Sequence, residues 1–302
     1  MSYSLTSNLS NLTGDLQEAF MDGFISDGVD LSPFIVQTTD KNTITNVGVN
    51  PPSGYLTVTE GADISTKAVE ESHAAVYQHV NKALGFAVSE QTKLTMPREM
   101  LLGFLGQLGA AAQRLFADVC YDILNNATST NGPDGVPLAS ASHPSAAGNQ
   151  SNTAAGALDF ASYEAGQRNI MTQQTNDGML AGYRADLLVV PAALNVTAFQ
   201  VNAPGAGQPT LGTSAAKNLV GAFAVPNYSA TQGIRTVVSA DLSSDTQWHL
   251  MDSRFSRLRC YVLKGPAPML QESDPDSGRL EVRDRIILAT GFDSFRATFI
   301  GT

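Results

Sequence analysis

The sequence contains almost no cysteine, with only Cys120 and Cys260 among its 302 residues. Two thiols make no disulfide framework, so we expect both to be reduced and buried in a core that holds the fold by itself. No apolar run reaches the roughly 20 residues of a membrane-spanning helix. The first residues also lack the basic and then apolar pattern of a secretory signal. We therefore expect no membrane partner.

Charged residues are scarce as well, at 15% of the chain, and the basic ones are fewer: 18 Lys and Arg against 28 Asp and Glu, a net charge of −10. No cluster of Lys and Arg with interleaved aromatic residues is present, which argues against a dedicated nucleic-acid-binding module. The 43% of hydrophobic residues excludes wholesale disorder. The chain is long enough for one large domain or two smaller ones.

Catalytic signatures are missing too. The sequence has no phosphate loop, no nucleophile elbow and no zinc-protease helix motif, and its four histidines are scattered. We predict no cofactor, no metal site and no catalytic residue. His143, in Ala141-Ser-His-Pro144, is the one candidate base, but the sequence offers no oriented nucleophile for it. A soluble enzyme using His143 remains an alternative to the assembly subunit that this composition favours.

One long amphipathic helix organises the chain, from Thr95 to Asn126. At about 1.5 Å per residue it would extend for roughly 45 Å, longer than most helices of globular proteins. Thr95 can cap its start and Pro97 is tolerated in its first turn. Its apolar residues recur at helical spacing: Leu101, Leu105, Leu108, Ala112, Leu115, Val119 and Ile123.

Two distinctive segments precede this helix. Residues 9–24 have an apolar helical face and are expected to form a helix that lies on another surface. Residues 37–66 predict a hairpin, with strands at Asn42–Val49 and Tyr55–Thr59 around a Pro/Gly turn. Such a polar ribbon is either a surface hairpin or an arm that reaches a neighbouring subunit. A helix at Val69–His79 and a strand at Gly85–Ser89 are predicted to follow.

Beyond Gly132 the composition shifts and helices and strands alternate without a regular βαβ repeat, which predicts an α+β fold class. The predicted helices are 161–175, 191–199 and 215–223. The predicted strands are 185–190, 233–238, 248–251, 257–263 and 280–300, with a turn at 274–278 before the last of them.

The order of these segments resembles that of a tailed-phage major capsid protein of the Hong-Kong-ninety-seven type, and most closely the Mu-like major head subunit family. The resemblance covers most of the chain. It is carried by Gly109-Ala-Ala-Ala-Gln-Arg114, Leu124-Asn-Asn126, Asp134-Gly-Val-Pro-Leu138, His143-Pro144, Asn152, Leu158 to Tyr163, and Leu187-Leu-Val-Val-Pro-Ala-Ala-Leu194.

This resemblance implies a phage major-capsid fold with four regions. They are an N-terminal arm (1–36), an extended β-hairpin loop (37–66), a peripheral domain (67–131 and 257–302) that includes the spine helix 95–126, and an axial domain (132–256). The arm begins almost at Met1, so we expect any scaffolding to come from a separate protein.

The implied function is a capsid subunit that self-assembles, through hexamers and pentamers, into an icosahedral shell around double-stranded DNA. The expected partners are other copies of the chain, a portal, scaffolding or protease proteins, decoration proteins, and packaged DNA contacted without sequence specificity. The expected location is the virion, assembled in the cytoplasm of a bacterial host. An encapsulin-like cellular compartment that encloses cargo enzymes is the alternative of the same fold.

The charge distribution suggests how copies could recognise one another. Residues 1–90 carry 11 acidic and 3 basic side chains, a net −8, whereas residues 254–302 carry 6 acidic and 8 basic ones, a net +2. We predict contacts between acidic and basic residues of adjacent copies. The acidic candidates are Asp27, Asp30, Glu60 and Asp63, and the basic candidates are Arg254, Arg257, Arg279, Arg283 and Arg285.

Overall fold

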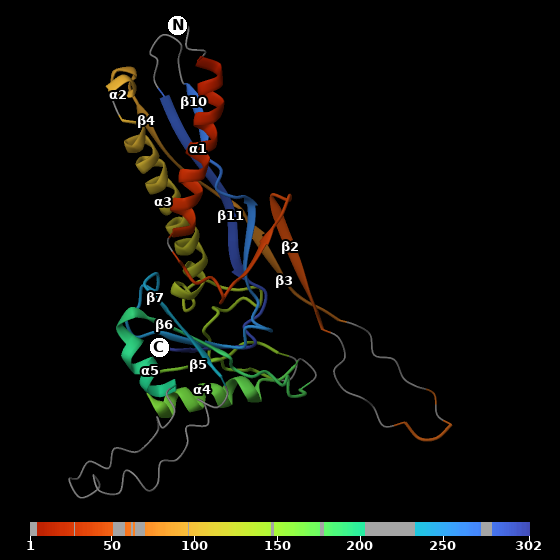
Figure 1. The fold of residues 1–302 in the computed structure, drawn as a ribbon. Coiled ribbons are helices and arrows are strands. Elements are labelled where there is room, and N and C mark those ends of the chain that lie inside the picture. Colours follow the sequence, from red (N-terminus) through yellow and green to blue (C-terminus); the bar gives the residue numbers. More distant parts are fainter. Residues whose placement is uncertain are drawn as a thin grey trace, which may run out of the picture.

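The computed structural model describes residues 5–26, 28–50, 58–61, 63, 70–95, 97–145, 148–175, 178–202, 233–272 and 280–302. Figure 1 shows a pair of layered regions, one above the other. In the upper region, long helices lie beside a twisted sheet, and in the lower region, shorter helices lie against another sheet. A two-stranded ribbon stands at the side of the upper region.

The predicted long helix is present, divided near its start. Helix α2 covers Glu90–Thr95 and helix α3 covers Arg98–Asn125. Pro97 separates them because proline has no N–H to donate and disfavours a helical backbone in the residue before it. Thr95 closes α2 instead of capping α3, since its hydroxyl donates to the Gln91 carbonyl at 2.9 Å. The buried face of α3 carries the predicted apolar residues Leu105, Leu108 and Ala112.

The N-terminal helix α1 (Leu5–Ser26), predicted over 9–24, lies along α3 in very close contact (Figure 1). Glycines make the close approach possible. A Cβ atom on Gly109 would lie 2.1 Å from the Phe20 carbonyl oxygen, and one on Gly23 would lie 2.0 Å from the Gly106 carbonyl oxygen. Phe20 is completely buried at this crossing. The two backbones therefore touch where a side chain would hold them apart.

The first sheet is built around one long strand, β11. Its strands are β1 (Ile35–Thr38), β4 (Val80–Val88), β9 (Leu258–Lys264), β10 (Met269–Glu272) and β11 (Leu280–Phe292). Strand β11 pairs with β4 along one edge and with β10 and then β9 along the other, always antiparallel, and β1 adds to β9 in parallel. Val282, Ile286 and Leu288 share one face of β11 and belong to the apolar core formed with α3.

The second sheet is covered on both faces. Its strand order is β5-β12-β8-β6-β7, with β5 Thr153–Ala154, β6 Leu187–Pro191, β7 Arg235–Ser239, β8 Trp248–Met251 and β12 Thr298–Gly301. In β6, Leu187 and Val189 pack in the core that contains α3. Leu188 and Val190 face the opposite way, into the core with α4 (Phe160–Thr172) and α5 (Asn195–Asn202). This is why β6 reads as an unbroken apolar run.

The two sheets share the last segment of the chain. Strand β11 lies in the first sheet, and after a corner at 293–297 strand β12 lies in the second, between β5 and β8. Residues 257–302, assigned from the sequence to a single domain with the spine helix, thus contribute strands to both sheets.

The prediction for residues 69–79 was wrong. They form strand β3 (Glu70–Gln78), which pairs with β2 (Thr43–Asn50) to make the ribbon. Burial alternates along β3, because Ala75 and Tyr77 face the protein while Ala74 and Val76 are exposed. A period of two is the strand pattern.

The second strand of the predicted hairpin, at 55–59, was also wrong in the part that the structure describes. Residues 58 and 59 form no strand, and residues 55–57 lie outside the described residues. The predicted helix at 215–223 and the turn at 274–278 lie outside them as well. The short strand β10 was not predicted. Among the described residues, no helix is long and apolar enough to span a membrane.

Candidate functional site

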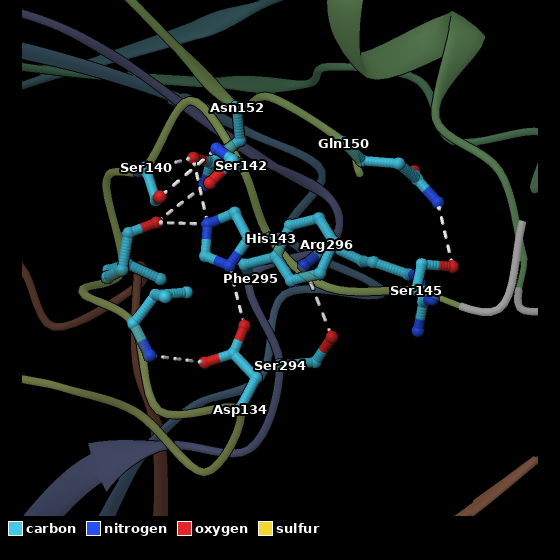
Figure 2. Close-up of polar contacts among 12 residues, drawn as sticks. Asp134, Ser140, Ser142, His143, Ser145, Gln150, Asn152, Ser294, Phe295 and Arg296 are labelled. Carbon is cyan, nitrogen blue, oxygen red and sulfur yellow. Dashed lines mark hydrogen bonds and ion pairs between the residues drawn. The ribbon is translucent and has the colours of Figure 1, made fainter. Parts of the chain in front are cut away.

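The first polar cluster surrounds His143, in the loop that joins α3 to β5 (Figure 2). The imidazole is completely buried and stacks on the Phe295 ring, with 3.7 Å between the ring centroids and 7° between the planes. Phe295 belongs to the corner between β11 and β12. The stack therefore joins a loop of the middle of the chain to the point where the two sheets meet.

Both ring nitrogens of His143 face oxygen acceptors. Nδ1 lies 2.6 Å from an Asp134 carboxylate oxygen, and Nε2 lies 3.2 Å from the Leu138 carbonyl oxygen and 3.1 Å from Asn152 Oδ1. The Asn152 amide is oriented by its own bonds, since its Nδ2 donates to Leu138 O at 2.7 Å and its Oδ1 accepts from the Ser140 N–H at 3.0 Å. The imidazole is therefore held on both sides by oxygen atoms of its own loop.

This geometry suits a buried structural contact better than a catalytic base. A general base must reach the proton that it removes, and the ring of His143 has no exposed surface. Within the described residues, its nitrogens contact carboxylate, carbonyl and amide oxygens, with no hydroxyl or thiol nucleophile among them. The described residues also contain no group of three or more His, Cys, Asp or Glu arranged to hold a metal ion.

The corner next to this cluster has an unusual backbone. Ala297 has φ of 63°, a left-handed conformation that costs energy for a residue with a Cβ. The Gln173 amide stabilises it from the end of α4, accepting from the Ala297 N–H at 2.7 Å and donating to the Thr298 carbonyl at 3.1 Å. The path from β11 into β12 is thus fixed by side chains from two other segments.

A second polar cluster anchors the root of the ribbon to the first sheet. Asp293 accepts hydrogen bonds from Asn46 Nδ2 at 3.1 Å and from the Tyr77 hydroxyl at 2.5 Å, and forms an ion pair with Arg259. Burial, followed by the hydrogen bond and charge of Asp293, raises the pKa of Tyr77, which therefore remains a donor. Tyr77 also packs edge-on against Tyr261, with 4.9 Å between ring centroids. Both strands of the ribbon are therefore held at their root.

The predicted contact residues fall into three groups. Asp27 and Arg279 lie outside the described residues. Four others have partners within the chain: Asp30 forms an ion pair with Arg235, Arg254 with Asp252, Arg283 with Glu281, and Arg285 donates to Asn81 at 2.8 Å. Glu60, Asp63 and Arg257 are exposed, and no described residue forms an ion pair with them.

Asp30 is the most firmly held of these residues. Burial raises the pKa of its carboxyl, but hydrogen bonds from Ser32 and the charge of Arg235 outweigh that effect, so the pKa is lowered overall. Its backbone carbonyl also accepts from the Tyr121 hydroxyl at 2.8 Å. Within this chain, Asp30 therefore ties the segment after α1 to β7 and α3.

A polar pocket of about 570 Å³ lies at the root of the ribbon. Three arginines line it: Arg257, Arg259 and Arg296. The sequence prediction named only Arg257. Arg296 follows β11, and only the antiparallel pairing of β9 with β11 brings it to Arg257, so the sequence did not indicate it. Arg259 lies two residues from Arg257 and was not singled out.

Residues 70–300 match a protein-family model described as phage capsid protein. The match covers the spine helix, the His143 cluster, and both sheets except β1 and the last residue of β12. The chain belongs to this family. No curated protein matches the sequence.

Solved structures share the fold at low sequence identity. A chain from Mycobacterium phage Adephagia is 15% identical with a TM-score of 0.58, over 90% of this chain and 88% of that one. A chain from the mature capsid of bacteriophage PhiM1 is 15% identical with a TM-score of 0.55, over 89% and 84%. A virus-like particle from Pyrococcus furiosus is 10% identical with a TM-score of 0.52, over 95% and 97%.

These findings confirm the functional prediction. The protein is a major capsid protein of a tailed phage, a structural component of the virion that assembles with copies of itself into a shell. The mixed α+β architecture of the capsid fold is confirmed as well.

Proposed function

We propose that this capsid protein has the Hong-Kong-ninety-seven-type arrangement, closest to the Mu-like major head subunit, and that its icosahedral shell of hexamers and pentamers encloses double-stranded DNA. The order of its segments supports this proposal. Helix α1 would be the arm. The ribbon and the residues beyond it would be the extended loop, and α3 with the first sheet would be the peripheral domain. The module within residues 132–256 would be the axial domain, converging on the symmetry axes.

The observation that carries the proposal is the contrast between the two ends of the extended loop. At its root, Asp293 and Tyr261 hold Asn46, and Asp293 also holds Tyr77. Farther out, residues 58–61 and 63 are all exposed, and Figure 1 draws 58–61 in orange at a distance from the body of the molecule. A projecting loop on a rigid root buries surface only when another molecule covers it. A neighbouring copy would be that molecule, with the arm reaching another copy.

The predicted contacts between acidic and basic residues belong to the same proposal. Exposed ion pairs contribute only about 0–1 kcal/mol each, so they would set the register between copies while many repeated contacts give the shell its strength. The other proposed partners are the portal, scaffolding or protease proteins, decoration proteins, and DNA contacted without sequence specificity. Assembly would take place in the host cytoplasm.

A shortened loop tests the proposal. Asn50 and Glu70 are paired directly across the ribbon, so a two-residue Asn-Gly turn can replace residues 51–69 and keep both strands. The full chain, expressed with its neighbouring genes, should give closed shells in negative-stain electron microscopy. The shortened chain should stay folded by circular dichroism but give only unassembled subunits.

Two results would contradict the proposal. If the shortened chain forms shells as well as the full chain, the loop is not needed for assembly. If neither chain forms shells, the proposed self-assembly is wrong. The contents of the shells decide between the two alternatives of the same fold. Nuclease-protected DNA is expected, whereas a cargo enzyme in place of DNA would select the encapsulin-like compartment.

A further inference from the structure

The pocket at the ribbon root carries an excess of positive charge. Arg257, Arg259 and Arg296 line it, against a single carboxylate, that of Asp293. His73 also lines it, from the ribbon strand β3. With the histidine neutral, the lining side chains have a net charge of +2.

The one carboxylate of the pocket already has three partners. Asp293 holds Arg259 in an ion pair and accepts from Asn46 and Tyr77. Arg257 is exposed and has no ion-pair partner among the described residues. Arg296 donates from Nε to the Gln174 carbonyl at 3.1 Å and lies over the Phe295 ring at 5.3 Å. Burial lowers the pKa of Arg296, and an opposite charge close to this guanidinium would favour its charged form.

Two carboxylates of complementary charge lie far along the same loop. Glu60 and Asp63 are exposed, and neither forms an ion pair with any described residue. Glu60 lies ten positions beyond Asn50, the end of β2. An extended chain of that length reaches up to about 33 Å. The loop thus has a basic pocket at its root and acidic side chains at its far end.

We propose that this pocket receives the Glu60 and Asp63 carboxylates of a neighbouring copy of the chain. The contact rests on the proposed shell assembly and identifies where the loop of one subunit ends on the next. It joins two different surfaces of identical chains, which is the head-to-tail contact that closes a ring. Charge complementarity in such a contact selects the partner surface and the register. Arg257 supplies the exposed positive charge. Arg259 and Arg296 supply positive charges whose positions are held by their contacts within the chain.

Charge reversal tests the contact. In Arg257→Glu, a carboxylate would face the incoming Glu60 and Asp63. Because the repulsion repeats at every contact of the shell, we expect the assembled fraction to fall by at least about tenfold. The double variant Glu60→Arg, Asp63→Arg places positive side chains against the three arginines of the pocket and should lower the assembled fraction as well. Sedimentation and negative-stain microscopy of the full chain, expressed with its neighbouring genes, give the assembled fraction.

A matched control separates this effect from a general change of surface charge. Arg168 is an exposed arginine on α4 that pairs with Glu164 of the same helix, and Arg168→Glu should leave assembly unchanged. Circular dichroism and Trp248 fluorescence of the unassembled variants should match those of the wild type, since Arg257 is exposed.

Three results would overturn the contact. They are Arg257→Glu shells in wild-type yield with wild-type DNA content, shells in wild-type yield from the Glu60→Arg, Asp63→Arg double variant, or Arg257→Glu shells that form normally but hold less DNA. The last result would mean that the pocket binds nucleic-acid phosphate. Wild-type shells in the same experiment would show that the proposed assembly stands even if this contact fails.

Discussion

A completely buried histidine at the centre of the second sheet should make the protein sensitive to acid. His249 lies in β8 directly opposite Val189 of β6 and Ile300 of β12, so the three side chains share one face. Val189 and Ile300 belong to the apolar core that includes α3. Neither ring nitrogen of His249 has a hydrogen-bond partner among the described residues. Burial lowers the pKa of His249 from 6.5 to about 3.

The size of the effect follows from the difference between the folded and unfolded pKa values. Between pH 6.5 and pH 3 the unfolded chain binds a proton at His249 and the folded chain does not, so the free energy of unfolding falls as the pH falls. Each pH unit in this window costs about 1.4 kcal/mol. At constant temperature and ionic strength, the loss from pH 6.5 to pH 4 is about 3 kcal/mol.

The variant His249→Leu removes the titrating group while keeping a similar volume. It should also be more stable by about 1–3 kcal/mol at pH 7, because two unpaired polar atoms leave the core. His73→Gln is the matched control, since it also removes one histidine, but an exposed one on the ribbon.

Urea unfolding of unassembled subunits at pH 7, 6, 5 and 4 measures the effect. Trp248, the only tryptophan, is buried beside His249 and reports unfolding of the second sheet by its fluorescence. Carboxylates also titrate in this range, so the decisive quantity is the difference between the wild type and His249→Leu. If the two stability curves run parallel from pH 6.5 to pH 4, the reasoning is refuted.

Two further predictions concern the packing of α1 on α3 and the buried contact between His143 and Asp134. Gly109→Ala should destabilise the subunit by about 1–3 kcal/mol in urea unfolding, because its Cβ would lie 2.1 Å from the Phe20 carbonyl oxygen. Gly103→Ala, with no atom within 4 Å, should be neutral or stabilising by up to about 1 kcal/mol, and equal effects at the two positions would contradict the close crossing. His143→Ala leaves the Asp134 carboxylate buried without its hydrogen-bond partner on the ring and should cost about 1–3 kcal/mol. An unchanged melting temperature of this variant would show that the pair does not hold the loop.

Much of the fold could be predicted from local patterns. The apolar spacing of Leu105, Leu108 and Ala112 predicted α3, and the apolar run before Pro191 predicted β6 with the short helical segments after it. These features depend on residues close together in the sequence. The ribbon strand β3 could not be recognised in the same way. Its Glu- and Ala-rich start suits a helix, and what makes it a strand is pairing with β2 and the bond from Tyr77 to Asp293, 216 residues away.

The candidate sites depended even more on long-range contacts. The sequence singled out His143, but its stacking partner Phe295 comes from the other end of the chain. Charge counting indicated Arg257, whereas Arg296 joins it only through the pairing of β9 with β11. Asp30 looked available to a neighbour in the sequence, yet it forms an ion pair with Arg235, 205 residues away.

The position of β12 has a consequence for how the protein is made. Strand β12 lies between β5 and β8, and the Thr153 hydroxyl next to it donates to the Ile300 carbonyl, 147 residues later in the chain. On the ribosome, β5, β6, β7 and β8 emerge before the strand that joins β5 to the others. The second sheet can therefore be completed only after residue 301 has left the exit tunnel. A nascent chain that stalls before this point has an open gap in that sheet, and such a fragment cannot supply a finished subunit.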